Sequence, residues 1–132
     1  LNPDNPFEVI GVLDWEMATI GDPLMDLGNS LAYWIEADDE GPFQMLRRQP
    51  THRPGMLTRK EVVAYYMEQS GFKVDNFDFY EIYGLFRLAV IIQQIYYRFY
   101  HGQTKDKRFA AFGHAANYLE KRCQRLIAES SL

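Results

Sequence analysis

The stretch "GVLDWEMATIGDPLMDLG", residues 11–28, places four carboxylates directly after an apolar run. They belong to Asp14, Glu16, Asp22 and Asp26, with no lysine or arginine among them. Charged groups beside a core are normally kept by partners, so the stretch predicts either ion pairs with basic residues elsewhere or a bound cation. The run Phe7–Leu13 is short, apolar and rich in β-branched residues, which predicts one strand buried on both faces.

The distribution of charge divides the chain. Residues 1–46 contain ten acidic and no basic side chains, whereas residues 47–132 contain fourteen basic and eight acidic ones. This asymmetry is typical of two parts of one fold that attract each other. Arg87 is the first charge inside a long apolar segment, and we expect it to pair with Asp26, Asp22 or Glu16. The scattered basic residues and the acidic balance of the chain argue against nucleic acid as a partner.

Length and composition indicate one ordered domain. The 132 residues are 47% hydrophobic and 15% aromatic, which is enough apolar material for a core. Cys123 is the only cysteine, and no secretory leader is apparent, so we expect a reducing, cytoplasmic location. The chain opens on "LNPDNPFE" without an initiator methionine, which leads us to expect a piece of a longer protein.

Helix signals follow the acidic stretch. Asp26 stands where a helix N-cap would precede "LGNSLAYWIEA". Thr58 and Glu61 have the spacing of a capping box, which predicts a helix that ends at Gly71. Residues 47–57, with two prolines and a glycine, predict an exposed connection between these helices.

The longest apolar segment is Tyr80–Tyr100, whose length would cross a bilayer. Four polar side chains make that insertion costly: Arg87, Gln93, Gln94 and Arg98. We therefore expect no membrane partner, but a central buried helix. A last helix is predicted around Lys107–Glu129, where apolar residues recur at steps of three and four.

Asp14 is the strongest candidate for chemistry. Hard divalent cations such as Mg²⁺ prefer carboxylate, phosphate and water oxygens, and an aspartate at the end of a buried strand is well directed for that role. Two alternatives stay open. Asp14 could simply cap the next turn, or all four carboxylates could converge in a metal-dependent hydrolase.

Several motifs together resemble the aminoglycoside phosphotransferase family of kinase-like small-molecule phosphotransferases. In order, the chain has an Asp after an apolar run, the pair Trp15–Glu16, a Gly-Asp-Pro triplet and Asp26 before Leu-Gly. The segments "DLGNSLAYW" and "RFAAFGHAANYLEKR" are similar to the branch of this family that is associated with acyl-CoA dehydrogenases. The resemblance implies a mainly α fold, namely the helical C-lobe portion of a protein kinase-like fold with one short N-terminal β-strand, partial over residues 1–132.

The resemblance also implies roles for individual residues. Asp14 is similar to the Mg²⁺-binding Asp that bridges the metal to the β- and γ-phosphates of ATP. Asp26 is similar to the Asp that begins the helix beneath the catalytic loop, while Glu16, Asp22 and Arg87 are expected to support the site structurally. The implied reaction moves a phosphoryl group from ATP to a hydroxyl of a small-molecule acceptor.

Other parts of a phosphotransferase do not occur in these residues. We find no phosphate loop, no strand Lys and no H-G-D-x-x-x-x-N catalytic loop. We therefore expect no catalytic residue in this chain and no activity from it alone. The alternative function is a non-catalytic helical interaction domain, in which exposed apolar surface drives homo-oligomer formation.

Overall fold

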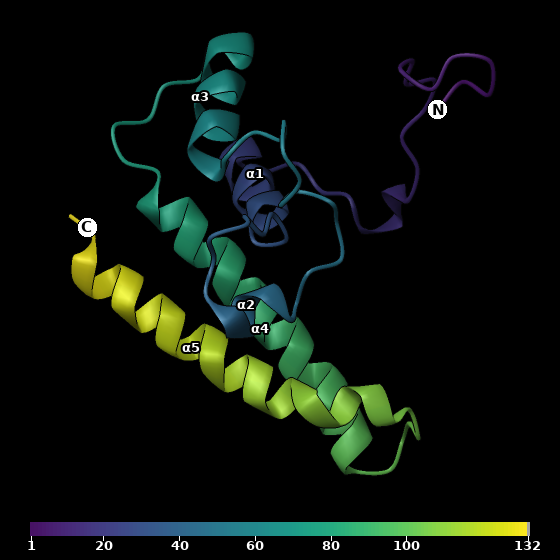
Figure 1. The fold of residues 1–132 in the computed structure, drawn as a ribbon. Helices are drawn as coiled ribbons and strands as arrows, with labels where there is room; N and C mark the ends of the chain where they lie inside the picture. The colour runs from purple at the N-terminus through teal and green to yellow at the C-terminus, as the bar shows by residue number, and fades with distance from the viewer. Residues whose placement is uncertain (132) are drawn as a thin grey trace.

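The computed structural model describes residues 1–131, except for the side chain of Met17. The regular structure in this range is helical (Figure 1). The elements are the 3-10 helices η1 (Trp15–Met17) and η2 (Lys107–Ala111) and the α-helices α1 (Pro23–Leu31), α2 (Gly41–Gln44), α3 (Arg59–Ser70), α4 (Asp78–Tyr100) and α5 (Phe112–Glu129).

The body of the molecule is the pair α4 and α5, which run side by side in opposite directions (Figure 1). Helix α1 packs on α4, and α2 packs on α5. Apolar side chains at helical spacing meet between these elements and exclude water. The buried core consists of Ala32, Ile35, Phe43, Leu85, Leu88, Ile92, Ala116, Leu119 and Cys123.

Two glycines allow α1 and α4 to cross closely. Gly28 and Gly84 face each other, and a methyl group on either would overlap backbone atoms of the opposite helix. A Cβ on Gly84 would meet the carbonyl of Gly28, and one on Gly28 would meet the carbonyl of Tyr80. The absence of side chains therefore sets the distance between these helices.

The helix predictions for the second half of the chain are confirmed. Helix α3 starts with a complete capping box of Thr58 and Glu61 and ends at Gly71 in the left-handed conformation. Helix α4 covers the predicted apolar segment, but only one face of it is buried, because Phe86 and Ile91 are exposed. Among the helices described, none has the length and apolar character needed to cross a membrane.

The N-terminal segment, residues 1–22, extends away from helices α1 to α5 and joins them at Asp22 (Figure 1). The predicted strand Phe7–Leu13 is wrong, because these residues are irregular and exposed. A strand is stable only when its amide and carbonyl groups pair with a neighbouring strand. Within residues 1–131 there is no second strand for it to pair with.

Candidate functional site

Asp14 has an unusual backbone. Its φ of 73° and ψ of 41° are left-handed, and it is the one non-glycine residue with positive φ in the described part of the chain. Such a conformation costs free energy for a residue with a Cβ, and in proteins it clusters at functional sites. The carboxylate is exposed and forms no capping hydrogen bond with η1. Asp14 therefore does not cap the following turn.

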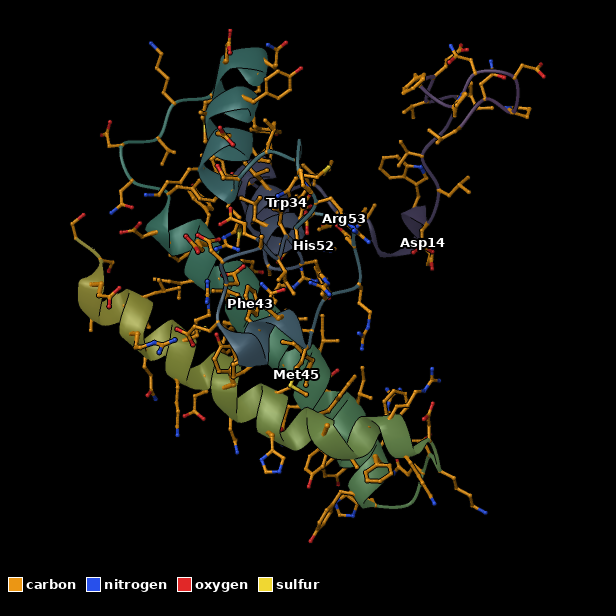
Figure 2. All side chains as sticks on the ribbon, in the orientation of Figure 1. Asp14, Trp34, Phe43, Met45, His52 and Arg53 are labelled. Carbon is orange, nitrogen blue, oxygen red and sulfur yellow. The ribbon has the colours of Figure 1, made fainter. Side chains whose placement is uncertain are left out.

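A tight turn fixes the chain just after Asp14. The indole N–H of Trp15 donates to the carbonyl of Val12 at 2.7 Å, and the amide of Ala18 donates to the carbonyl of Trp15 at 2.9 Å. In Figure 2, Asp14 lies on the N-terminal segment, apart from the core residue Phe43. Glu16, in the same turn, is exposed. The turn leaves the Asp14 carboxylate open to a ligand.

Asp22 is the N-cap of α1. Its carboxylate accepts a hydrogen bond from the amide of Leu24 at 2.9 Å and another from the hydroxyl of Tyr80 at 2.9 Å. The bond to Asp22 raises the pKa of the Tyr80 hydroxyl, and desolvation adds to this shift. Asp22 therefore joins the start of α1 to α4.

Asp26 was predicted to be this N-cap, and that prediction is wrong. Asp26 is exposed in the first turn of α1, where its charge is favourable for the helix dipole. The helix starts one turn earlier because Pro23 occupies its first position, for which the fixed φ of proline is suited. The sequence signal was the pair Asp22–Pro23, an N-cap followed by proline.

The four carboxylates of residues 11–28 do not form one metal site. Within the part of the chain that the structure describes, no three His, Cys, Asp or Glu side chains converge to hold a metal ion. The hydrolase alternative needs such convergence and is therefore wrong. Asp14 fits Mg²⁺ as a single oxygen ligand, with phosphate oxygens and water completing the shell.

The pairing predicted for Arg87 is also wrong. Arg87 is exposed on α4, and no carboxylate within residues 1–131 lies at ion-pair distance from it. The acidic first third of the chain does bind the basic remainder, but through other residues. The carboxylates that form these pairs follow α1, in the sequence "EADDE", residues 36–40.

Asp39 is the centre of this ion-pair network. Its carboxylate accepts two hydrogen bonds from the Arg59 guanidinium, at 2.6 and 3.0 Å, and one from Arg122 at 3.2 Å. The Arg122 guanidinium also lies 4.4 Å from the centroid of the Phe43 ring, within cation–π distance. Nearby, Arg125 pairs with Glu40 at 2.7 Å.

The network keeps Asp39 ionised. Burial alone would raise the pKa of the Asp39 carboxyl. The hydrogen bonds from Arg59 and the Glu36 amide, and the charges of Arg59 and Arg122, outweigh burial and lower the pKa below its ordinary value. Arg59 also pairs with Glu36 at 3.2 Å. These contacts join the connection after α1 to α3 and α5, so the network is a structural clamp distant in sequence from Asp14.

Comparison with known proteins shows what the first part of the chain is similar to. Residues 2–61, from the N-terminal segment to the start of α3, match the phosphotransferase enzyme family. The matched range includes Asp14 and the whole of α1. Over these residues the chain is therefore similar to the phosphotransferase enzyme family.

Particular relatives extend the likeness into the helices. "Acyl-CoA dehydrogenase family member 10" of Mus musculus is 38% identical over 104 residues, covering 75% of this chain and 9% of the relative. "Probable acyl-CoA dehydrogenase IBR3" of Arabidopsis thaliana is 30% identical over 131 residues, covering 94% of this chain and 16% of the relative. "Acyl-CoA dehydrogenase family member 11" of Mus musculus is 32% identical over 105 residues, covering 75% and 13%.

The chain thus spans between 9% and 16% of the length of these relatives. No solved structure matches it significantly.

Proposed function

We propose that this chain supplies the metal-binding aspartate of a phosphotransferase that uses ATP and Mg²⁺. Its reaction moves a phosphoryl group to a hydroxyl of a small molecule. The observation that carries the proposal is Asp14, an exposed carboxylate in a left-handed conformation, inside the residues that match the family. Strain of this kind is retained where the geometry has a use.

The residues around Asp14 have supporting roles in this proposal. The turn at Trp15 directs the Asp14 carboxylate outward. Asp22 anchors the other end of the segment to α4 through the Tyr80 hydroxyl. Asp26 adds negative charge to the first turn of α1, and we assign no chemical step to Glu16. When bound, Mg²⁺ would neutralise charge on the phosphates during transfer.

The acceptor base and the nucleotide pocket lie outside these residues in this proposal, because the chain has no H-G-D-x-x-x-x-N motif. The chain alone is therefore expected to be inactive. The relatives are named for acyl-CoA dehydrogenases. On this ground we propose hydroxylated acyl compounds as the first acceptors to test.

The test is Asp14→Asn in the full-length protein encoded by the gene. A metal contact contributes several kcal/mol to transition-state stabilisation, so we expect the rate of ATP-dependent phosphorylation to fall about 100-fold or more. The control is Asp38→Asn, the same change at an exposed aspartate that lies outside the motif residues 11–28. Unchanged Mg²⁺-dependent activity in Asp14→Asn would show that the metal role is wrong.

A second function is favoured by one observation. Large apolar side chains of the N-terminal segment are almost fully exposed, with Phe7 at 94%, Leu13 at 87% and Ile20 at 104%. Exposed apolar side chains in this number favour assembly when they gather on one surface. We propose that this segment mediates contact with a second copy of the chain or with another part of a longer protein.

Light scattering over a range of concentrations separates the two possibilities for the isolated chain. We expect self-association that weakens when Phe7 and Ile20 are both replaced by serine. The matched control replaces Thr19, an exposed polar neighbour of Ile20, by serine. A strictly monomeric chain at high concentration would count against a second copy as the partner of this segment.

A further inference from the structure

The connection between α2 and α3 carries a concentration of positive charge. Residues 41–60 contain no Asp or Glu, and Arg47, Arg48 and Arg53 lie within seven residues of each other. All three side chains are exposed. We call residues 47–53 the arginine loop.

The arginines of this loop lack acidic partners, as Arg87 and Arg98 on α4 also do in the described residues, but only the loop brings three such arginines within seven residues. Four arginines, namely Arg59, Arg108, Arg122 and Arg125, each have a carboxylate at ion-pair distance. None of the three arginines of the loop has one among the carboxylates of residues 1–131. The contacts of the loop arginines are neutral instead. Arg47 donates to the Gln44 side chain at 3.0 Å, and Arg48 donates to the carbonyl of Arg47 at 3.1 Å.

The loop is held in place by the core. Thr51 is buried, and its hydroxyl donates to the carbonyl of Ile35 at 2.8 Å. Pro50 and Pro54 restrict the backbone on either side, and the amide of Arg53 donates to the carbonyl of Pro50 at 3.0 Å. A fixed loop loses little conformational entropy when it binds a ligand.

The charges of the arginine loop act on His52. His52 lies between them in the sequence. Desolvation lowers the pKa of its imidazole, and the charges of Arg47 and Arg53 lower it further. The Nδ1 atom of His52 is buried and has no hydrogen-bond partner in the described residues. In Figure 2, Arg53 lies on the side of the helical body that faces Asp14.

We propose that the arginine loop binds the phosphate groups of a small-molecule ligand. Guanidinium groups match phosphate in planar, two-bonded geometry, and several of them on one fixed loop give an anion site rather than scattered surface charge. The phosphates belong either to a nucleotide or to a phosphorylated acceptor. Binding itself does not depend on the transfer reaction proposed above.

Inorganic pyrophosphate without metal is the probe, measured by titration calorimetry on the full-length protein at low salt. The test variant is Arg47→Gln with Arg53→Gln. The matched control is Arg87→Gln with Arg98→Gln, which removes the same charge from two arginines of α4 that also lack acidic partners in the range described.

We expect the test variant to bind pyrophosphate about tenfold more weakly, because two charge-assisted contacts are lost, and the control to bind as the wild type does. Arg53→Lys keeps the charge but loses the planar, two-bonded geometry of the guanidinium, so its affinity for pyrophosphate should lie between those of the test variant and the control. The proposal is overturned if the wild type does not bind pyrophosphate. It is also overturned if the control loses as much affinity as the test variant.

A second arm identifies the source of the phosphates. If MgATP binding weakens both in the test variant and in Asp14→Asn, the loop holds nucleotide phosphates. If MgATP binding in the test variant is unchanged while pyrophosphate binding weakens, the loop holds a separate phosphorylated ligand. Either result supports an anion site. Unchanged binding of both probes in the test variant contradicts it.

Discussion

The N-terminal segment and the helical body have similar apolar content but differ in how much of it is buried. Residues 7–20 are as rich in large apolar side chains as α4 and α5, yet Phe7, Leu13 and Ile20 are exposed. In the body, side chains such as Leu119 and Phe43 are buried almost completely. The helices form their own backbone hydrogen bonds and bury one face against each other. An extended segment needs a partner both for its backbone hydrogen bonds and for the burial of its side chains.

The same substitution in the two regions gives the largest contrast. Leu119→Ala removes a fully buried side chain and should lower the free energy of unfolding by about 3 kcal/mol. Leu13→Ala, at a leucine that is 87% exposed, should change it by less than about 0.5 kcal/mol. Chemical denaturation of the two variants measures both values. Equal losses would mean that the N-terminal segment is packed in solution.

The next largest effect on stability is expected from the ion-pair network around Asp39. Asp39→Asn leaves Arg59 and Arg122 without their common carboxylate, so the free energy of unfolding should fall by about 2–3 kcal/mol. This value is at or below the lower end for a buried ion pair, because both arginines are partly exposed. Asp14→Asn removes a carboxylate that has no such partner and should leave stability nearly unchanged. Thermal unfolding of both variants compares the two aspartates. A loss as large for Asp14→Asn would contradict the exposed position of that carboxylate.

The contribution of Asp39 also depends on pH. The pKa of the Asp39 carboxyl is lower in the folded chain than its ordinary value of 3.8. Its ion pairs therefore stabilise the fold fully above that value, and the contribution is lost as pH falls through the lower folded-state pKa. The difference in stability between wild type and Asp39→Asn should shrink below about pH 3.8. A difference that is constant down to pH 2 would exclude this linkage.

A smaller contrast compares two glycines. Gly84→Ala places a methyl group against the Gly28 carbonyl, and the resulting separation of α1 and α4 should cost about 2 kcal/mol. Gly11→Ala, in the N-terminal segment, meets nothing within 4 Å. It should be neutral or slightly stabilising, because alanine restricts the unfolded chain. Guanidinium denaturation curves provide the comparison, and a neutral Gly84→Ala would mean that the helices do not cross at this point.

Elements with local signals could be predicted from the sequence. The capping box of Thr58 and Glu61 lies within one turn and marks the start of α3, and α4 and α5 follow the apolar pattern of their sequences. Local signals could not decide whether residues 7–13 form a strand. Their pattern shows a preference, but strand formation depends on a partner that no local pattern contains.

The site was predictable only in part. The motif from Asp14 to Gly28 indicated the family, because its residues follow each other in order. The contacts that balance the charge asymmetry were not found, since Asp39 meets Arg59 across 20 residues and Arg122 across 83. The acidic run after α1 was the available signal, but several arginines could have been its partners. The close approach of Gly28 and Gly84 likewise depends on tertiary packing.

The central claim is that the Asp14 carboxylate binds the metal of a phosphotransferase. The most direct test is the metal specificity of Asp14→Cys. It is measured as ATP-dependent phosphorylation by the full-length protein with different metal ions. A thiolate is a poor ligand for Mg²⁺ and a good one for softer cations such as Cd²⁺. We predict that Asp14→Cys loses activity with Mg²⁺ and regains part of it with Cd²⁺. Asp14→Asn should also lose activity with Mg²⁺, but Cd²⁺ should not restore it. Full activity of Asp14→Cys with Mg²⁺ would contradict the claim.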